Sequence, residues 1–67
     1  MTIFAQRLKE LRLENNLSQN KLAKQLGISQ AAINKWEKGI IIPTIDSAAI
    51  VAKFFNVSID YLAGLED

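Results

Sequence analysis

The chain has 67 residues, a net charge of +1, and neither cysteine nor histidine. This is the length of one small domain, and the missing residue types exclude disulfides and the usual zinc ligands as sources of stability. No apolar run approaches the ~18 residues of a membrane span, and there is no signal-peptide pattern, so we expect a cytoplasmic protein. We do not expect an enzyme, because the usual catalytic histidine and cysteine are missing and the glycines form no phosphate-binding loop. We expect one domain over residues 1–67, with no metal, cofactor or small-molecule ligand.

The first predicted helix covers about residues 2–15. Phe4, Leu8 and Leu11 are spaced to form one apolar stripe along it. Leu13 lies off this stripe, and we expect it to be partly exposed. The helix therefore has one face directed to a core.

The second predicted helix begins after Ser18, a favoured N-cap residue, and ends at Gly27, the usual residue for a left-handed C-terminal turn. Leu22 and Leu26 would form its buried edge, with the small Ala23 beside them at the crossing with the next helix. The polar residues of this helix would face outward, and they are Gln19, Asn20, Lys21, Lys24 and Gln25.

A third helix is predicted over residues 30–38, and Ser29 is its cap. Only Gly27 and Ile28 separate the two elements, and so short a connection forces a steep crossing that is typical of a helix-turn-helix. At about 100° per residue, an outward arc of about 140° contains no acidic residue. Its members are Gln30, Ala31, Asn34, Lys35 and Lys38, opposite the apolar Ala32, Ile33 and Trp36.

The charge distribution agrees with a DNA-facing second and third helix. Residues 18–39 hold four lysines and one glutamate, a net charge of +3, whereas residues 40–67 hold one lysine and four acidic residues, a net charge of −3. Positive charge close to a polar helix favours contact with nucleic acid. Lysines on solvated helix faces are also common, so this signal is moderate.

The remaining chain predicts two more helices. An apolar segment, residues 40–43, precedes Thr44, the predicted cap of a fourth helix that extends to Phe55. Ile50 and Phe54 fall on its outer side, which is unusual for a monomer. A short fifth helix follows Ser58. We expect a broad buried face on the fourth helix, made by Ile45, Ala48, Ala49, Val51, Ala52 and Phe55.

Five short helices with brief connections predict an all-α fold, and the sequence resembles a known family over nearly its whole length. The segments LKELRLENNLSQNKLAKQLGISQAAINKWEKG and FFNVSIDYLAG, with Pro43 between them, resemble the phage repressor and Cro class of helix-turn-helix regulators, the XRE family. The resemblance implies a compact five-helix bundle of the lambda-repressor type, in which residues 18–39 form the helix-turn-helix. The spacing of five residues is specific: Gln19, Ala23, Gly27, Ile33 and Trp36.

The resemblance also implies roles for individual residues. The third helix would lie in the major groove of double-stranded DNA. Arg12 and Glu37 would form an ion pair that orients this helix. The phosphate-binding residues would be Gln19, Asn20 and Lys38, and the base-reading residues would be Gln30, Ala31, Asn34 and Lys35.

The chain departs from the family pattern at two places. After Gly39, where relatives often have basic or polar residues, this chain has Ile40, Ile41 and Ile42, and position 50 is isoleucine instead of a polar residue. Exposed apolar residues often mark partner surfaces. We therefore expect a homodimer on a two-fold symmetric operator, with contacts from Ile41, Ile42, Ile50 and Phe54. The alternative, packing of these residues beneath the loop or the C-terminus, is equally compatible with the sequence.

The leading interpretation is a sequence-specific transcriptional regulator of bacterial or phage origin, most simply a repressor. Two alternatives remain open. One is a protein-interaction module of the same fold, such as an antitoxin-like partner or an adaptor, which the low net charge and the isoleucine loop favour. The other is the DNA-binding domain of a longer regulator.

Overall fold

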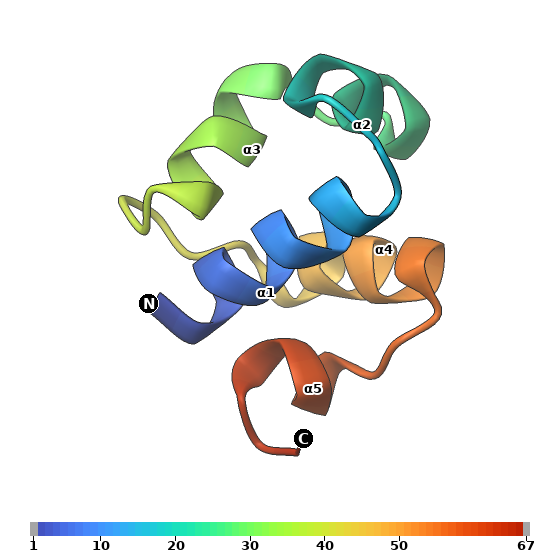
Figure 1. Ribbon diagram of the computed structural model, residues 1–67. Helices are drawn as coiled ribbons and strands as arrows, with labels where there is room; N and C mark the ends of the chain where they lie inside the picture. Colours follow the sequence, from blue (N-terminus) through green and yellow to red (C-terminus); the bar gives the residue numbers. More distant parts are fainter. Residues whose placement is uncertain (1, 67) are drawn as a thin grey trace.

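The computed structural model describes residues 2–66, and the described chain is all α-helical (Figure 1). This confirms the predicted fold class and the order of the helices. The third helix ends one residue earlier than expected, and Lys38 is its C-cap. The helices are α1 (Thr2–Glu14), α2 (Gln19–Leu26), α3 (Gln30–Glu37), α4 (Ile45–Phe55) and α5 (Ile59–Ala63).

The helix boundaries follow from local hydrogen bonding. Each N-cap hydroxyl accepts a hydrogen bond from a backbone N–H three residues later, which satisfies a donor that the helix itself cannot pair. The helices α2, α4 and α5 end where the backbone enters the left-handed region. The N-caps are the predicted Ser18, Ser29, Thr44 and Ser58.

Each helix contributes one fully buried side chain to a shared core, and the five are Leu8, Leu22, Ile33, Val51 and Leu62. Phe4 of α1 packs edge-on against Trp36 of α3, with ring centroids 6.2 Å apart. The stripe predicted on α1 is confirmed, and Leu13 is exposed as expected. The core therefore holds the apolar side of α3 against α1 and leaves the opposite side of α3 exposed.

The helix α5 lies at the opposite end of the molecule from α2 and α3 (Figure 1). Arg7 of α1 holds it there: the guanidinium lies 4.3 Å from the centroid of the Tyr61 ring and donates to the carbonyl oxygens of Tyr61 and Glu66. None of the helices in residues 2–66 is long and apolar enough to cross a membrane.

The predicted buried face of α4 was too broad. Ala48, Val51 and Ala52 are buried, but Ile45 is 70% exposed and Ala49 is exposed as well. On a helical wheel, these two residues lie on one flank of the buried arc. The neighbouring helices cover the side of the predicted face that carries Ala48, Val51 and Ala52 and leave the other side exposed, so apolar character alone did not decide burial here.

Candidate nucleic-acid interface

The second and third helices form a helix-turn-helix with a three-residue connection. The Ile28 N–H donates to the carbonyl of Ala23 at 3.0 Å, which closes the end of α2, and Ser29 begins α3 immediately afterwards. Ala23 of α2 is buried in the core, as are Leu22 of the same helix and Ile33 of α3. A small residue at this point lets the helices approach closely, so α3 leaves the body of the domain at a fixed angle.

Gly27 makes this connection possible through its backbone. Its φ is +68° and its ψ is +32°, a left-handed conformation that L side chains adopt at a cost. A Cβ at this position would meet no atom within 4 Å. Glycine is therefore required by the dihedral angles of the turn rather than by lack of space.

The outward face of α3 carries the predicted base-reading residues together. Gln30, Ala31 and Lys35 are exposed, and Asn34 is half-buried. Ile33 and Trp36 lie on the opposite side in the core. The helix is thus anchored by its apolar side and presents two amides, one small side chain and one lysine to the exterior.

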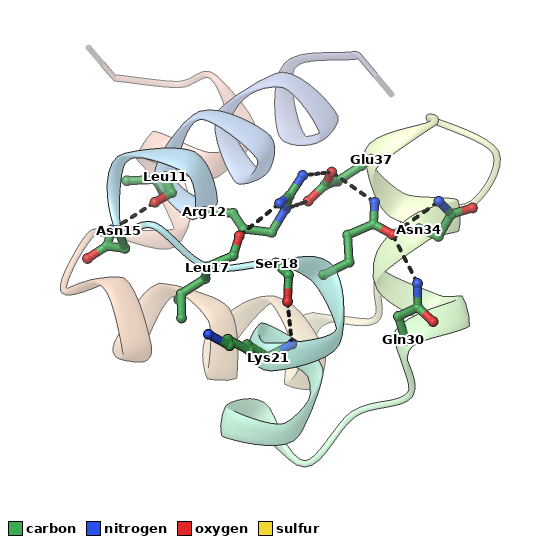
Figure 2. Close-up of polar contacts among 10 residues, drawn as sticks. Leu11, Arg12, Asn15, Leu17, Ser18, Lys21, Gln30, Asn34 and Glu37 are labelled. Carbon is green, nitrogen blue, oxygen red and sulfur yellow. Dashed lines mark hydrogen bonds and ion pairs between the residues drawn. The ribbon is translucent and has the colours of Figure 1, made fainter.

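Glu37, the only acidic residue of α3, is turned away from this face and paired. Arg12 of α1 donates from Nε to Glu37 Oε2 at 2.6 Å and from Nη2 to Oε1 at 2.9 Å (Figure 2). Its Nη1 donates to the Leu17 carbonyl at 2.8 Å. The two side chains are only 10% and 5% exposed. This bidentate pair connects α1, the loop before α2 and the end of α3.

The pairing also fixes the charge state of Arg12. The hydrogen bonds to Glu37 raise the pKa of the guanidinium, with a further contribution from the attraction between the charges, and partial burial opposes them. Arg12 therefore stays protonated at every physiological pH. The negative charge of Glu37 is neutralised inside the protein and does not face the exterior.

Gln19, at the first position of α2, is half-buried rather than turned outward. Its Nε2 donates to Glu37 Oε1 at 3.1 Å, and its Oε1 accepts from Asn34 Nδ2 at 3.2 Å and from Gln30 Nε2 at 3.4 Å. We call Gln19, Gln30 and Asn34 the amide cluster; Figure 2 shows Asn34 between Glu37 and Gln30 along α3. The cluster joins the ion pair to the outward face of α3.

The other predicted phosphate-binding residues lie at the edges of this face. Asn20 is exposed in the first turn of α2, where free backbone N–H groups and the helix dipole attract anions. Lys38 is exposed at the C-terminal end of α3. Both side chains are thus accessible to a phosphate.

The residues predicted for self-association are exposed, but they lie on two surfaces. Ile42 lines an open apolar groove together with Pro43, with Ile45 at the start of α4, and with residues of α1 and α5. Ile50 and Phe54 do not line this groove; they are about 140° and 180° around α4 from Ile45. Ile41 is exposed in the loop between α3 and α4.

Sequence reasoning missed the amide cluster. Gln19, Gln30 and Asn34 were each singled out, but as separate residues facing outward. The sequence does contain three amides and a glutamate at positions 19, 30, 34 and 37. These spacings alone did not predict the cluster, because hydrogen bonds between α2 and α3 depend on the angle at which the two helices cross.

Comparison with known proteins identifies the fold. Residues 8–62 match the HTH_3 helix-turn-helix family. The chain is 44% identical over 64 residues to the HTH-type transcriptional activator BcrR of Enterococcus faecalis, which covers 96% of this chain and 31% of BcrR. It is 30% identical over 57 residues to the cryptic phage CTXphi transcriptional repressor RstR of Vibrio cholerae, which covers 85% of this chain and 51% of RstR.

The solution structure of the SOS-response transcriptional repressor LexA from Eubacterium rectale superposes with a TM-score of 0.85 at 32% sequence identity, over 97% of this chain and 67% of that one. By the coverages given above, this chain spans about a third of the length of BcrR and about half of the length of RstR. A match over residues 8–62 includes the ion pair, the amide cluster and the turn at Gly27. The chain belongs to the HTH_3 family of helix-turn-helix proteins, the XRE type that its sequence resembles.

Proposed function

We propose that this protein is a sequence-specific regulator of transcription that represses by inserting α3 into the major groove of double-stranded DNA. The observation that carries the proposal is the composition of the free face of α3. That face holds amides and lysines and no unpaired acid, because Glu37 is turned inward onto Arg12. A negative DNA groove therefore meets only neutral or positive side chains.

The proposed contacts divide into two kinds. Gln30, Ala31, Asn34 and Lys35 would meet base edges: amides suit adenine, lysine suits guanine O6 or N7, and a methyl group suits thymine. Gln19, Asn20 and Lys38 would bind phosphates and set the register of α3 along the groove. Gln19 retains one Nε2 proton beyond its bond to Glu37, so a phosphate contact and the amide cluster are compatible.

The relatives support a regulator and lean toward repression. RstR and the LexA neighbour are named as transcriptional repressors, whereas BcrR is named as an activator. A repressor needs only to occupy a site, which a domain of this kind can do with its DNA-binding surface alone. We place its action in the cytoplasm of a bacterium, from a bacterial or phage gene.

We further propose that the protein binds a two-fold symmetric operator as a homodimer. Ile41, Ile42, Ile50 and Phe54 are all at least 40% exposed, so this small domain presents large apolar side chains on two surfaces, either of which could contact a second copy. With a net charge of only +1, one copy has little long-range attraction to DNA. Two linked copies would raise the affinity through simultaneous contact with both half-sites.

Selection of DNA from a random pool, followed by titration of the enriched site at two salt concentrations, tests this function. A regulator enriches a half-site motif repeated with two-fold symmetry, and its affinity falls steeply with salt. The alternative is a protein-interaction module, favoured by the isoleucine loop. It predicts that no motif is enriched and that replacing Gln30 and Lys38 together leaves DNA binding unchanged.

A further inference from the structure

The orientation of an amide side chain decides what it offers to a base. An amide has a carbonyl that accepts and an NH₂ group that donates two hydrogen bonds, and rotation by 180° exchanges the two ends. In the amide cluster, the orientation of Gln19 determines which ends Gln30 and Asn34 must turn toward it. The question is what fixes the orientation of Gln19.

The answer is the carboxylate of Glu37. Ionised and held by Arg12, it can only accept hydrogen bonds, so Gln19 must turn its Nε2 toward Glu37 Oε1, 3.1 Å away. The Gln19 carbonyl then points to α3, where it lies 3.2 Å from Asn34 Nδ2 and 3.4 Å from Gln30 Nε2. The polarity of the whole cluster follows from one buried negative charge.

This polarity leaves a defined pattern on the outer side. Asn34 and Gln30 each use one N–H on Gln19, so each keeps its carbonyl and one N–H for a base. One acceptor beside one donor complements adenine, which offers N6–H₂ and N7 in the major groove. If Gln19 were reversed, Asn34 and Gln30 would each turn their carbonyl to it and present two donors, the pattern that complements guanine O6 and N7.

We propose that the Arg12–Glu37 ion pair, without touching DNA, sets the preference for adenine over guanine at the base positions read by Gln30 and Asn34. The inference rests on the proposed function, because it assumes that α3 reads bases. Arg12 and Glu37 are positioning residues in this scheme. Asn34 is half-buried and its hydrogen bond to Gln19 is the shorter one, so its base position is the more strongly affected.

Two variants test the proposal. Glu37→Gln keeps the size of the side chain but replaces the acceptor-only carboxylate with an amide, which can face Gln19 with its oxygen or its NH₂. Because Arg12 Nη2 also donates to the Oε1 position, this variant releases Gln19 from a single orientation without forcing it to reverse. The double variant Arg12→Met/Glu37→Met removes both charges with unbranched apolar side chains and leaves Gln19 free to take either orientation. Gln30→Ala and Asn34→Ala identify which operator position each amide reads, by the position at which each relaxes selection.

The measurement is the affinity for adenine against guanine at those two positions, in competition binding with the selected operator. For the natural chain we expect adenine to be favoured about 5- to 150-fold, the range for one good bidentate contact. The double variant should lose at least about fivefold of this preference, and Glu37→Gln should lose part of it, since neither variant holds Gln19 in one orientation. The position read by Lys35 is the internal control and should not change, since Lys35 is outside the cluster.

A purely structural role of the ion pair gives a different result. It would lower the affinity for all operators equally and leave the preference for adenine intact, and that outcome in folded variants overturns the inference while the proposed function stands. If the natural chain enriches no motif, the proposed function fails and the inference falls with it.

Nuclear magnetic resonance of the natural chain keeps the inference testable if the variants do not fold. One Nε2 proton of Gln19 should be shifted downfield and protected from exchange, in contrast to the exposed Gln25. Gln19 amide signals that are indistinguishable from those of Gln25 would also overturn it.

Discussion

The free face of α3 and the outer flanks of α4 are both exposed, yet they are built in opposite ways. On α3, Gln30 and Asn34 donate hydrogen bonds to Gln19 of α2, which in turn donates to Glu37 of the buried ion pair. Around α4, large apolar side chains are exposed to solvent; Ile42 is 65% exposed and Ile45 is 70% exposed. The first arrangement fixes side-chain orientation, as base reading requires. The apolar arrangement around α4 makes no directional contacts, and such a surface is suited to packing against a partner.

This contrast leads to predictions of decreasing size. The largest concerns the ion pair behind α3. Glu37→Met should destabilise the fold by about 3–5 kcal/mol, because it leaves the charge of the buried Arg12 guanidinium without its carboxylate. The double variant Arg12→Met/Glu37→Met should be far less destabilised, since no unpaired charge remains. Urea denaturation of both variants measures the difference, and equal losses would show that the unpaired guanidinium is not the source of the destabilisation.

The next prediction concerns the turn that positions α3. Gly27→Ala should cost about 1–2 kcal/mol, the penalty of a Cβ in the left-handed region, even though the Cβ meets no neighbour. Gln25→Ala, at an exposed site of α2, is the control and should change the stability by no more than about 0.5 kcal/mol. Thermal unfolding followed by circular dichroism compares them; a neutral Gly27→Ala would mean that the turn can relax.

A smaller effect is expected on DNA binding from a single lysine. Lys38→Ala should weaken binding to all sequences alike and reduce the slope of log affinity against log salt by about 1. Lys53→Ala removes the same charge from the exposed side of α4 and should leave the slope unchanged. Fluorescence anisotropy at several salt concentrations measures both slopes. A loss confined to one operator sequence would place Lys38 on a base instead.

The smallest effect on stability is expected at the apolar surfaces around α4. Ile42→Ser and Ile50→Ser should each change the free energy of unfolding by no more than about 0.5 kcal/mol, as for exposed sites elsewhere. If either surface forms the dimer, that variant should sediment as a monomer at concentrations at which the natural chain associates with operator DNA. Dimers that persist in both variants would place the interface elsewhere, and a strictly monomeric natural chain, with and without DNA, would rule out the dimer.

The sequence by itself determined the helices and the turn between α2 and α3. Caps such as Ser18 and Ser29, and the exit at Gly27, act through hydrogen bonds and dihedral angles within a few residues, so local sequence was sufficient to predict them. The buried stripe of α1 followed from spacing in the same way. The polar face of α3 was also predictable, because residue spacing fixes which side chains share a side of a helix.

Only the tertiary structure decided the orientation of the amides and the burial of borderline apolar residues. Gln19 reaches Glu37 and Asn34 because α2 crosses α3 at a particular angle, and no local pattern encodes that distance. Ile45 is as apolar as Val51, but burial requires a neighbour on the other side, and α2 and α5 pack against α4 in a way that leaves the flank with Ile45 exposed. Short-range forces choose the helices, whereas hydrogen bonds and contacts between helices depend on how the whole core packs.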